Sequence, residues 1–303
     1  MYTITSSILS RFPCLKDLCL DVCNLKLHSD FRFNKLVRLD LYYVVLEENQ
    51  LQWMLSTSST IEWLRIRWCN LPEKLCIGEN LQRLSSLMIH DLSDLRETEL
   101  NAKSLNFFDF VGRAIVKFSF LSNTKLKSSH VALIDKNYKG AECIIRDLAT
   151  SIPSLETLLL EGPYSLLHLI PTHPSTLFRR VVRLSLIFKS EDPEVDMVKS
   201  FPRLLNSFWQ LQKLYLMVPD TFLRRKYDLP GARYCSWIPW ASYFLKSTVA
   251  LDRMLNSRHL LPNTREGEWK RSAAHSFSQQ ECDYIRLALQ GNAISPNADL
   301  VIQ

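Results

Sequence analysis

A recurring spacing of apolar residues runs through most of this chain. Residues 15–25 read L-x-x-L-x-L-x-x-C-x-L, and residues 61–71 repeat this spacing with Ile at the first and third apolar positions. Apolar residues at alternate positions predict a short strand with one buried face, because successive side chains of a strand point to opposite sides. The later Cys and Leu are expected to turn the chain over the same core.

Sets of three such apolar positions recur at intervals of 21 to 30 residues. They begin at Leu15, Leu36, Ile61, Leu84, Leu105, Leu126, Leu155, Val181 and Leu211. The set at Leu126 is the weakest, since Ser129 stands where a Leu is expected. This period is typical of leucine-rich repeats, whose units bury their apolar faces only by stacking on one another. We therefore expect an α/β leucine-rich-repeat solenoid with a curved parallel sheet and helical or irregular return segments.

The repeat rhythm also suggests how the chain is divided. Residues 1–14 are expected to form a lead-in or partial cap repeat, 15–217 the solenoid, and 218–303 a C-terminal cap that is loose in part. Helical spacing of Leu51, Met54 and Leu55, and again of Ile144, Ile145 and Leu148, predicts two helices on the return side. The aromatic segment 237–245 is interpreted as packing within the cap, or alternatively as a partner-binding patch.

The outward positions of the predicted strands carry the candidate site. They alternate with the buried Leu and Ile residues and would line the concave surface of a solenoid. Tyr, Trp and Arg, which are over-represented in binding hot spots, gather on the second and third strands. The alternative is that these are ordinary exposed side chains of a polar face. The predicted partner-binding residues are Arg38, Asp40, Tyr42, Trp63, Arg65, Arg67, Met88 and His90.

Composition and charge argue against several other classes of protein. The net charge of +6 is mild and the basic residues are spread along the chain, so nucleic acid is not an expected partner. Seven glycines without a phosphate-binding loop argue against a nucleotide cofactor. Neither a signal peptide nor an apolar run of about 20 residues is found, so an intracellular protein, cytoplasmic or nuclear and without membrane contact, is expected.

The cysteines and histidines provide no chemical motif. Cys23 and Cys69 are absorbed by the repeat pattern, while Cys19 is expected to point away from Cys23, so neither a metal site nor a disulfide framework is predicted. The seven histidines are isolated, with no nucleophile or paired carboxylate at a recognisable spacing. We therefore predict a protein that is not an enzyme and needs no cofactor.

Several stretches resemble the repeat region of plant F-box/LRR proteins, including the subgroup with a C-terminal FBD segment. They are F-P-C-L-K-D-L-C-L-D-V-C (12–23), T-I-E-W-L-R-I-R-W-C-N-L (60–71), L-N-F-F-D-F-V-G (105–112) and S-I-P-S-L-E-T-L-L-L (151–160). The resemblance covers residues 10–217, and 244–255 and 294–302 are faintly similar to the FBD segment.

The resemblance implies a non-catalytic substrate receptor of an SCF-type ubiquitin ligase that captures a protein target with its repeats. No F-box precedes the repeats here, so a Skp1-like adaptor is an expected partner only if an F-box is supplied upstream. The alternative is a free-standing leucine-rich-repeat interaction or scaffold protein with no ligase role.

Overall fold

The predicted strands form a parallel sheet in the computed structural model. The model describes residues 1–78, 80–91, 94–113, 116–120, 125–134, 141–162, 178–188, 208, 210–217, 253–256, 260–263, 268–271 and 299–302. Its contacts divide the chain into two units, Met1–Leu155 and Glu156–Gln303, and each is described by itself. The predicted boundaries at residues 14 and 217 remain expectations.

The main sheet of the first unit is built from one strand of each repeat. In spatial order these strands are β2 (Asp17–Asp21), β4 (Arg38–Tyr42), β6 (Trp63–Arg67), β8 (Ser86–His90), β10 (Phe107–Gly112) and β12 (Ser128–Leu133). All neighbours are parallel, and equivalent residues of successive repeats stand opposite one another. The apolar spacing therefore predicted both the strands and their register.

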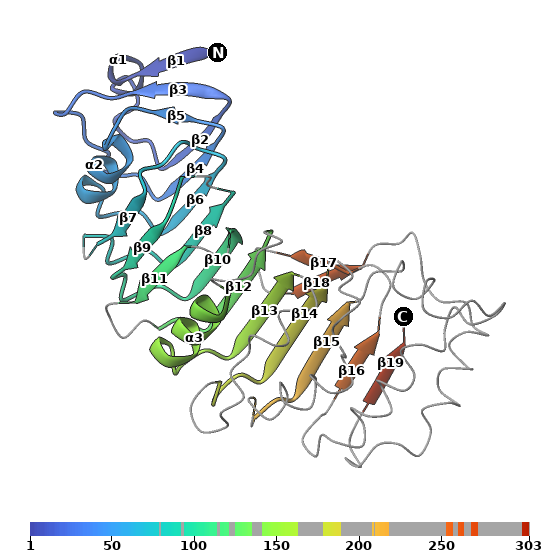
Figure 1. Ribbon diagram of the computed structural model, residues 1–303. Coiled ribbons are helices and arrows are strands. Elements are labelled where there is room, and N and C mark those ends of the chain that lie inside the picture. The colour runs from blue at the N-terminus through green and yellow to red at the C-terminus, as the bar shows by residue number, and fades with distance from the viewer. Residues whose placement is uncertain are drawn as a thin grey trace. The chain divides into compact units, whose positions relative to one another are not determined.

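A second layer, here called the return layer, lies behind the main sheet (Figure 1). It contains two small parallel sheets, β1–β3–β5 and β7–β9–β11. Their strands are β1 (Tyr2–Thr5), β3 (Cys23–Lys26), β5 (Val45–Leu46), β7 (Lys74–Ile77), β9 (Glu97–Leu100) and β11 (Lys117–Phe120). The helices are α1 (Ser6–Leu9), α2 (Gln50–Thr57) and α3 (Ala141–Ser151), and α2 and α3 are the two that the spacing predicted.

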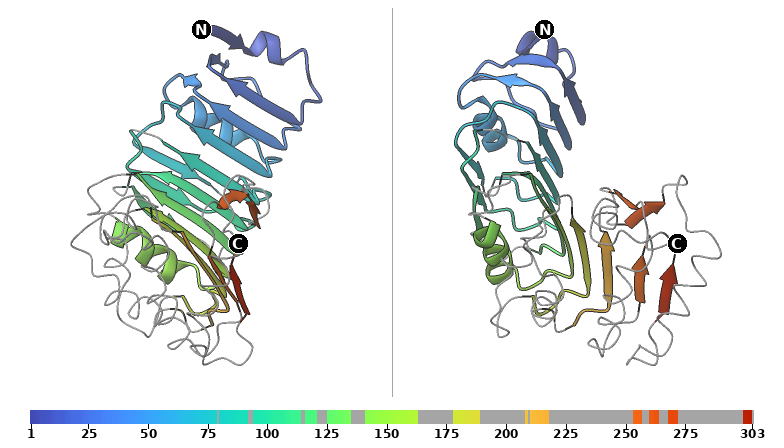
Figure 2. Two further views of the ribbon diagram at one scale, coloured as in Figure 1. Left: turned by 90° about the vertical axis from the view of Figure 1, so that its right-hand side faces the viewer. Right: turned by 45° about the vertical axis from the view of Figure 1, so that its right-hand side comes forward.

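The core of this unit fills the space between the two layers. Leu39, Leu64 and Leu87 are fully buried in one column of the main sheet, and Met54 and Ile145 reach the core from the helices. Figure 2 shows the two layers edge-on. Stacked rows of this kind bury each repeat against its neighbours, which is how a solenoid obtains a continuous core.

The weakest predicted repeat is present as well. Ser129 continues the column of buried residues on β12, opposite Phe108, and Leu126 and Val131 are buried beside it. Backbone pairing and two apolar anchors are thus sufficient to keep this strand in register despite the polar residue.

Two side-chain amides form hydrogen bonds with the backbone of one edge strand in each small sheet. Asn70 donates from Nδ2 to the Leu46 carbonyl (2.9 Å) and accepts from the Leu46 N–H (2.8 Å). Gln52 on α2 makes the same pair of bonds with Cys76 on β7, donating to its carbonyl (2.9 Å) and accepting from its N–H (3.1 Å). Each amide replaces a missing strand, which satisfies backbone groups that an edge would leave unpaired.

The cysteine positions agree with the repeat pattern. Cys23 and Cys69 are buried and Cys19 is exposed. Burial raises the pKa of the Cys69 thiol to about 11, so this side chain stays protonated and packs as a small apolar group.

The second unit contains the later strands. Its parallel neighbours are β13 (Thr157–Gly162), β14 (Arg183–Phe188), β15 (Lys213–Met217), β16 (Arg253–Asn256) and β19 (Asp299–Ile302). An antiparallel pair, β17 (Leu260–Asn263) and β18 (Glu268–Arg271), accompanies them. The aromatic segment 237–245 lies outside the described residues. Within the described segments, no helix is long and apolar enough to cross a membrane.

Candidate protein-binding face

The face of the main sheet that points away from the core, here called the sheet face, carries three aligned columns of side chains. The first is Asp17–Arg38–Trp63–Ser86–Phe107–Ser128, the second Cys19–Asp40–Arg65–Met88–Asp109–His130, and the third Asp21–Tyr42–Arg67–His90–Val111–Ala132. The alternation read from the sequence is therefore correct for every predicted site residue, since all eight stand in these columns.

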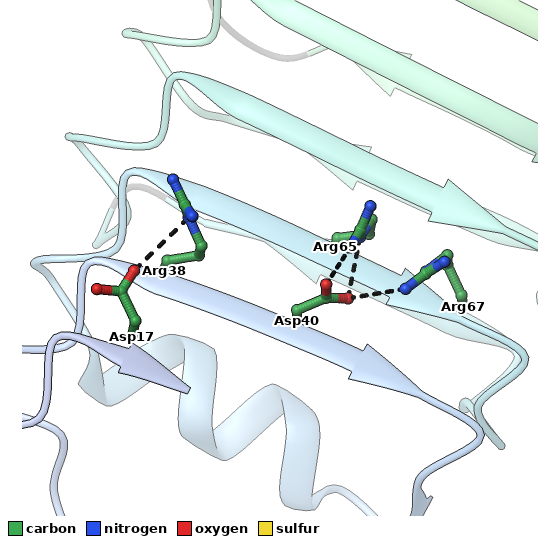
Figure 3. Close-up of polar contacts among 5 residues, drawn as sticks. All are labelled: Asp17, Arg38, Asp40, Arg65 and Arg67. Carbon is green, nitrogen blue, oxygen red and sulfur yellow. Dashed lines mark hydrogen bonds and ion pairs between the residues drawn. The ribbon is translucent and has the colours of Figure 1, made fainter. Parts of the chain in front are cut away.

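One carboxylate organises the charges at the centre of this face. Asp40 accepts hydrogen bonds from Arg65 Nε (Oδ1, 3.0 Å) and from Arg65 Nη2 at its other oxygen. Arg67 Nη2 lies 3.5 Å from Asp40 Oδ1 (Figure 3). Asp40 is buried and both arginines are only partly exposed, so this two-pronged pairing fixes the direction of Arg65. Two guanidinium groups share one carboxylate, which leaves one positive charge uncompensated within the trio.

Aromatic rings contact the arginines of this face. The guanidinium carbon of Arg65 lies 4.9 Å from the centre of the Trp63 ring, and that of Arg38 lies 5.3 Å from it. Arg67 lies 4.7 Å from the ring centre of Tyr42. Contacts of this kind between a cation and an aromatic ring are worth about 0.5–1 kcal/mol at exposed sites and more when desolvated. The long side chains of this face are thus held by contacts within the chain.

The predicted site residues differ in how accessible they are. Arg38 is exposed and makes an ion pair with Asp17 (3.6 Å), while Tyr42, Trp63, Arg65, Arg67 and His90 are half-buried. Met88 is only 3% exposed, so it supports its neighbours rather than offering a contact surface of its own.

A second carboxylate, beyond the fourth strand, was not among the predicted site residues. Asp109 on β10 is 0% exposed, with His90 Nε2 at 3.0 Å from Oδ2 and His130 Nδ1 at 2.9 Å from Oδ1. Burial acts to raise the pKa of Asp109, but the interactions with His130 and His90 outweigh it and lower this pKa to about 2. In the described part of the chain, no group of His, Cys, Asp or Glu is arranged to hold a metal ion. Both histidines are instead turned toward the carboxylate.

Tyr43 and Trp68 were missed as well. They follow the last residues of β4 and β6 and belong to the largest exposed apolar side chains among the described residues. Tyr42, Tyr43 and Trp68 bring their rings together, with centres 5.1 to 5.5 Å apart. No glycine or asparagine marks these positions, so the turn that exposes them left no signal in the sequence.

A parallel strand from each repeat, a return layer and an ordered polar face define a leucine-rich-repeat domain, a class that generally binds other proteins. The chain belongs to the family described as At1g61320/AtMIF1, LRR domain, whose model matches residues 1–228. The matched region extends past the predicted solenoid at both ends. No curated protein matches the sequence.

Proposed function

We propose that this chain is a non-catalytic binding protein that captures a protein target on the sheet face of β4, β6 and β8. The observation that carries this proposal is the ordered cluster of Arg38, Trp63, Arg65 and Arg67 around Asp40. A surface whose rotamer-rich side chains are already fixed loses less conformational entropy when a partner binds. Trp, Tyr and Arg are also the residue types that dominate binding hot spots.

Replacing Trp63 by Ala tests the face. It removes the ring between two guanidinium groups without unpairing Asp40, which the loss of Arg65 would do. We expect the affinity for a partner selected on the intact chain to fall by more than about 2 kcal/mol, as measured by isothermal titration calorimetry.

Trp53→Ala is the matched control. Trp53 lies on α2 in the return layer and also has an arginine, Arg32, near its ring at 4.9 Å. This variant should bind like the parent. An unchanged affinity in a folded Trp63→Ala protein would rule out the sheet face as the centre of binding.

The finer proposal is that target capture serves an SCF-type ubiquitin ligase, as the resemblance to F-box/LRR proteins implies. The test is to produce the chain together with its natural upstream sequence and to measure its binding to a purified Skp1-like adaptor. Binding in the micromolar range or tighter supports the ligase role. A folded product without adaptor binding favours the free-standing interaction protein.

A further inference from the structure

The turns that follow the first four strands of the main sheet share one backbone conformation. Val22, Tyr43, Trp68 and Asp91, which follow β2, β4, β6 and β8, have φ angles of 48°, 50°, 49° and 51°. Each N–H donates to a carbonyl at the end of the next strand: to Tyr42 (2.9 Å), Arg67 (3.0 Å), His90 (3.1 Å) and Val111 (2.6 Å). In these four repeats the backbone therefore takes the left-handed conformation at this point.

Three of these four side chains suit neither the backbone nor the core. Asp tolerates the left-handed region, but a β-branched Val and bulky Tyr and Trp are rarely found there. Strained residues of this kind cluster at functional sites. The side chains of Val22, Tyr43 and Trp68 lie outside the buried core, since these residues are 51%, 48% and 41% exposed.

The exposed rings form an ordered surface. Tyr43 and Trp68 are stacked with their centres 5.5 Å apart and their planes 21° apart. Tyr42 packs edge-on against both, at interplanar angles of 77° and 85°. Val22 precedes Tyr43 in the row of turns, so the apolar surface continues onto the first repeat.

The charge beside these rings indicates what kind of partner they suit. Arg67 packs over Tyr42, and its contact with Asp40 is the longer one, because Arg65 already binds both oxygens of that carboxylate. The Arg67 side chain is 26% exposed, although its Nε is buried. In the strand register, Tyr42 lies between Asp21 on β2 and Arg67 on β6. An acidic group near these rings would thus be attracted by the one positive charge that Asp40 leaves uncompensated on Arg65 and Arg67.

We propose that Val22, Tyr42, Tyr43 and Trp68, here called the edge cluster, bind an extended segment of a partner protein together with Arg67. The segment presents an apolar side chain to the rings of Tyr43 and Trp68 and a nearby Asp or Glu side chain to Arg67. This goes beyond the proposed function, because it adds the edge of the main sheet to its face, and it does not depend on a ligase role.

The test is to select short random peptides displayed on phage against the full chain. Enriched peptides should pair an apolar residue with a nearby Asp or Glu. Replacing that acid by its amide in a synthetic peptide should lower the affinity of the peptide for the chain about tenfold, as expected for one lost charge-assisted hydrogen bond. Enrichment without this pairing, or no enrichment, would overturn the proposal.

The Tyr43→Asn/Trp68→Asn double variant separates binding from folding. Asn accepts the left-handed backbone, so the melting temperature should not fall, whereas peptide affinity should drop at least about tenfold. Phe12→Asn, which removes an exposed ring before β2, should keep both properties. Unchanged peptide affinity in the double variant would show that the rings do not form a binding site.

Discussion

Asp109 shows how a single residue can make the stability of a repeat array depend on pH. Its carboxylate is completely buried between His90 and His130, and its pKa is lowered from an ordinary value of 3.8 to about 2. A lowered pKa means that the ionised form favours the folded state. This contribution is fully present above the ordinary pKa and is lost as the pH falls through the folded-state value.

We expect the contribution of Asp109 to the pH dependence of stability to disappear when this residue is replaced by Asn. Lowering the pKa of Asp109 from 3.8 to about 2 corresponds to about 2 kcal/mol. The gap in unfolding free energy between the parent and Asp109→Asn should therefore narrow by about this amount between about pH 5 and pH 2. Urea denaturation followed by circular dichroism measures it. A gap that stays constant over this range would contradict the assignment.

At the scale of elements, the return layer depends on side-chain amides that form hydrogen bonds with the backbone of edge strands. Asn70 and Gln52 each pair with one backbone N–H and one carbonyl, at β5 and at β7. An amide can do this because it carries a donor and an acceptor side by side. A carboxylate of the same shape can offer only acceptors when ionised.

Asn70→Asp is thus expected to place a carboxylate oxygen against the Leu46 carbonyl, where Nδ2 now donates. One hydrogen bond is lost and a repulsive contact replaces it, so unfolding free energy should fall by about 1–2 kcal/mol at neutral pH. Chemical denaturation measures this, with Asn34→Asp at an exposed position as the control for the added charge. Equal losses in the two variants would argue that charge alone, not the sealed edge, is responsible.

How much the sequence predicts also differs between elements. The strands β4, β6 and β8 and their outward residues followed from local alternation, and helices α2 and α3 followed from helical spacing. The same alternation, applied to β10 and β12, would have named Asp109 and His130. Which side chains bond to one another across β8, β10 and β12 depends on side-chain conformation, which no local pattern contains.

Two further features were beyond a reading of the sequence. Tyr43 and Trp68 stand at left-handed positions without the Gly or Asn that usually marks them, so their exposure depends on the repeat geometry alone. The two arginines that share Asp40 were assigned to the face, but which of them binds it through both oxygens depends on side-chain placement. The positions of these side chains could be predicted, whereas their hydrogen-bond partners could not.

At the scale of the first unit, stability is expected to follow position along the stack. Leu64 is fully buried with Leu39 and Leu87 on either side, whereas Leu15 in the first repeat is half-buried. In a solenoid each repeat touches only its neighbours, so an inner repeat loses contacts on two sides and an end repeat on one.

Leu64→Ala should accordingly cost about 2–5 kcal/mol of unfolding free energy, as for other buried Leu truncations. Leu15→Ala should cost clearly less, because part of its side chain is already in water. Equilibrium unfolding of both variants gives the comparison. Equal costs would mean that the first repeat is supported as firmly as the third.

The turn after β2, β4, β6 and β8 has one more consequence, which concerns how such a protein can change. Val, Tyr, Trp and Asp occupy the same turn position in four successive repeats, and the same backbone hydrogen bond forms in each. The turn is held by a backbone hydrogen bond, and four different residue types occupy this position. Copying a repeat and altering that one residue would therefore give a new contact surface on an unchanged scaffold, so recognition can diversify while the architecture is inherited intact.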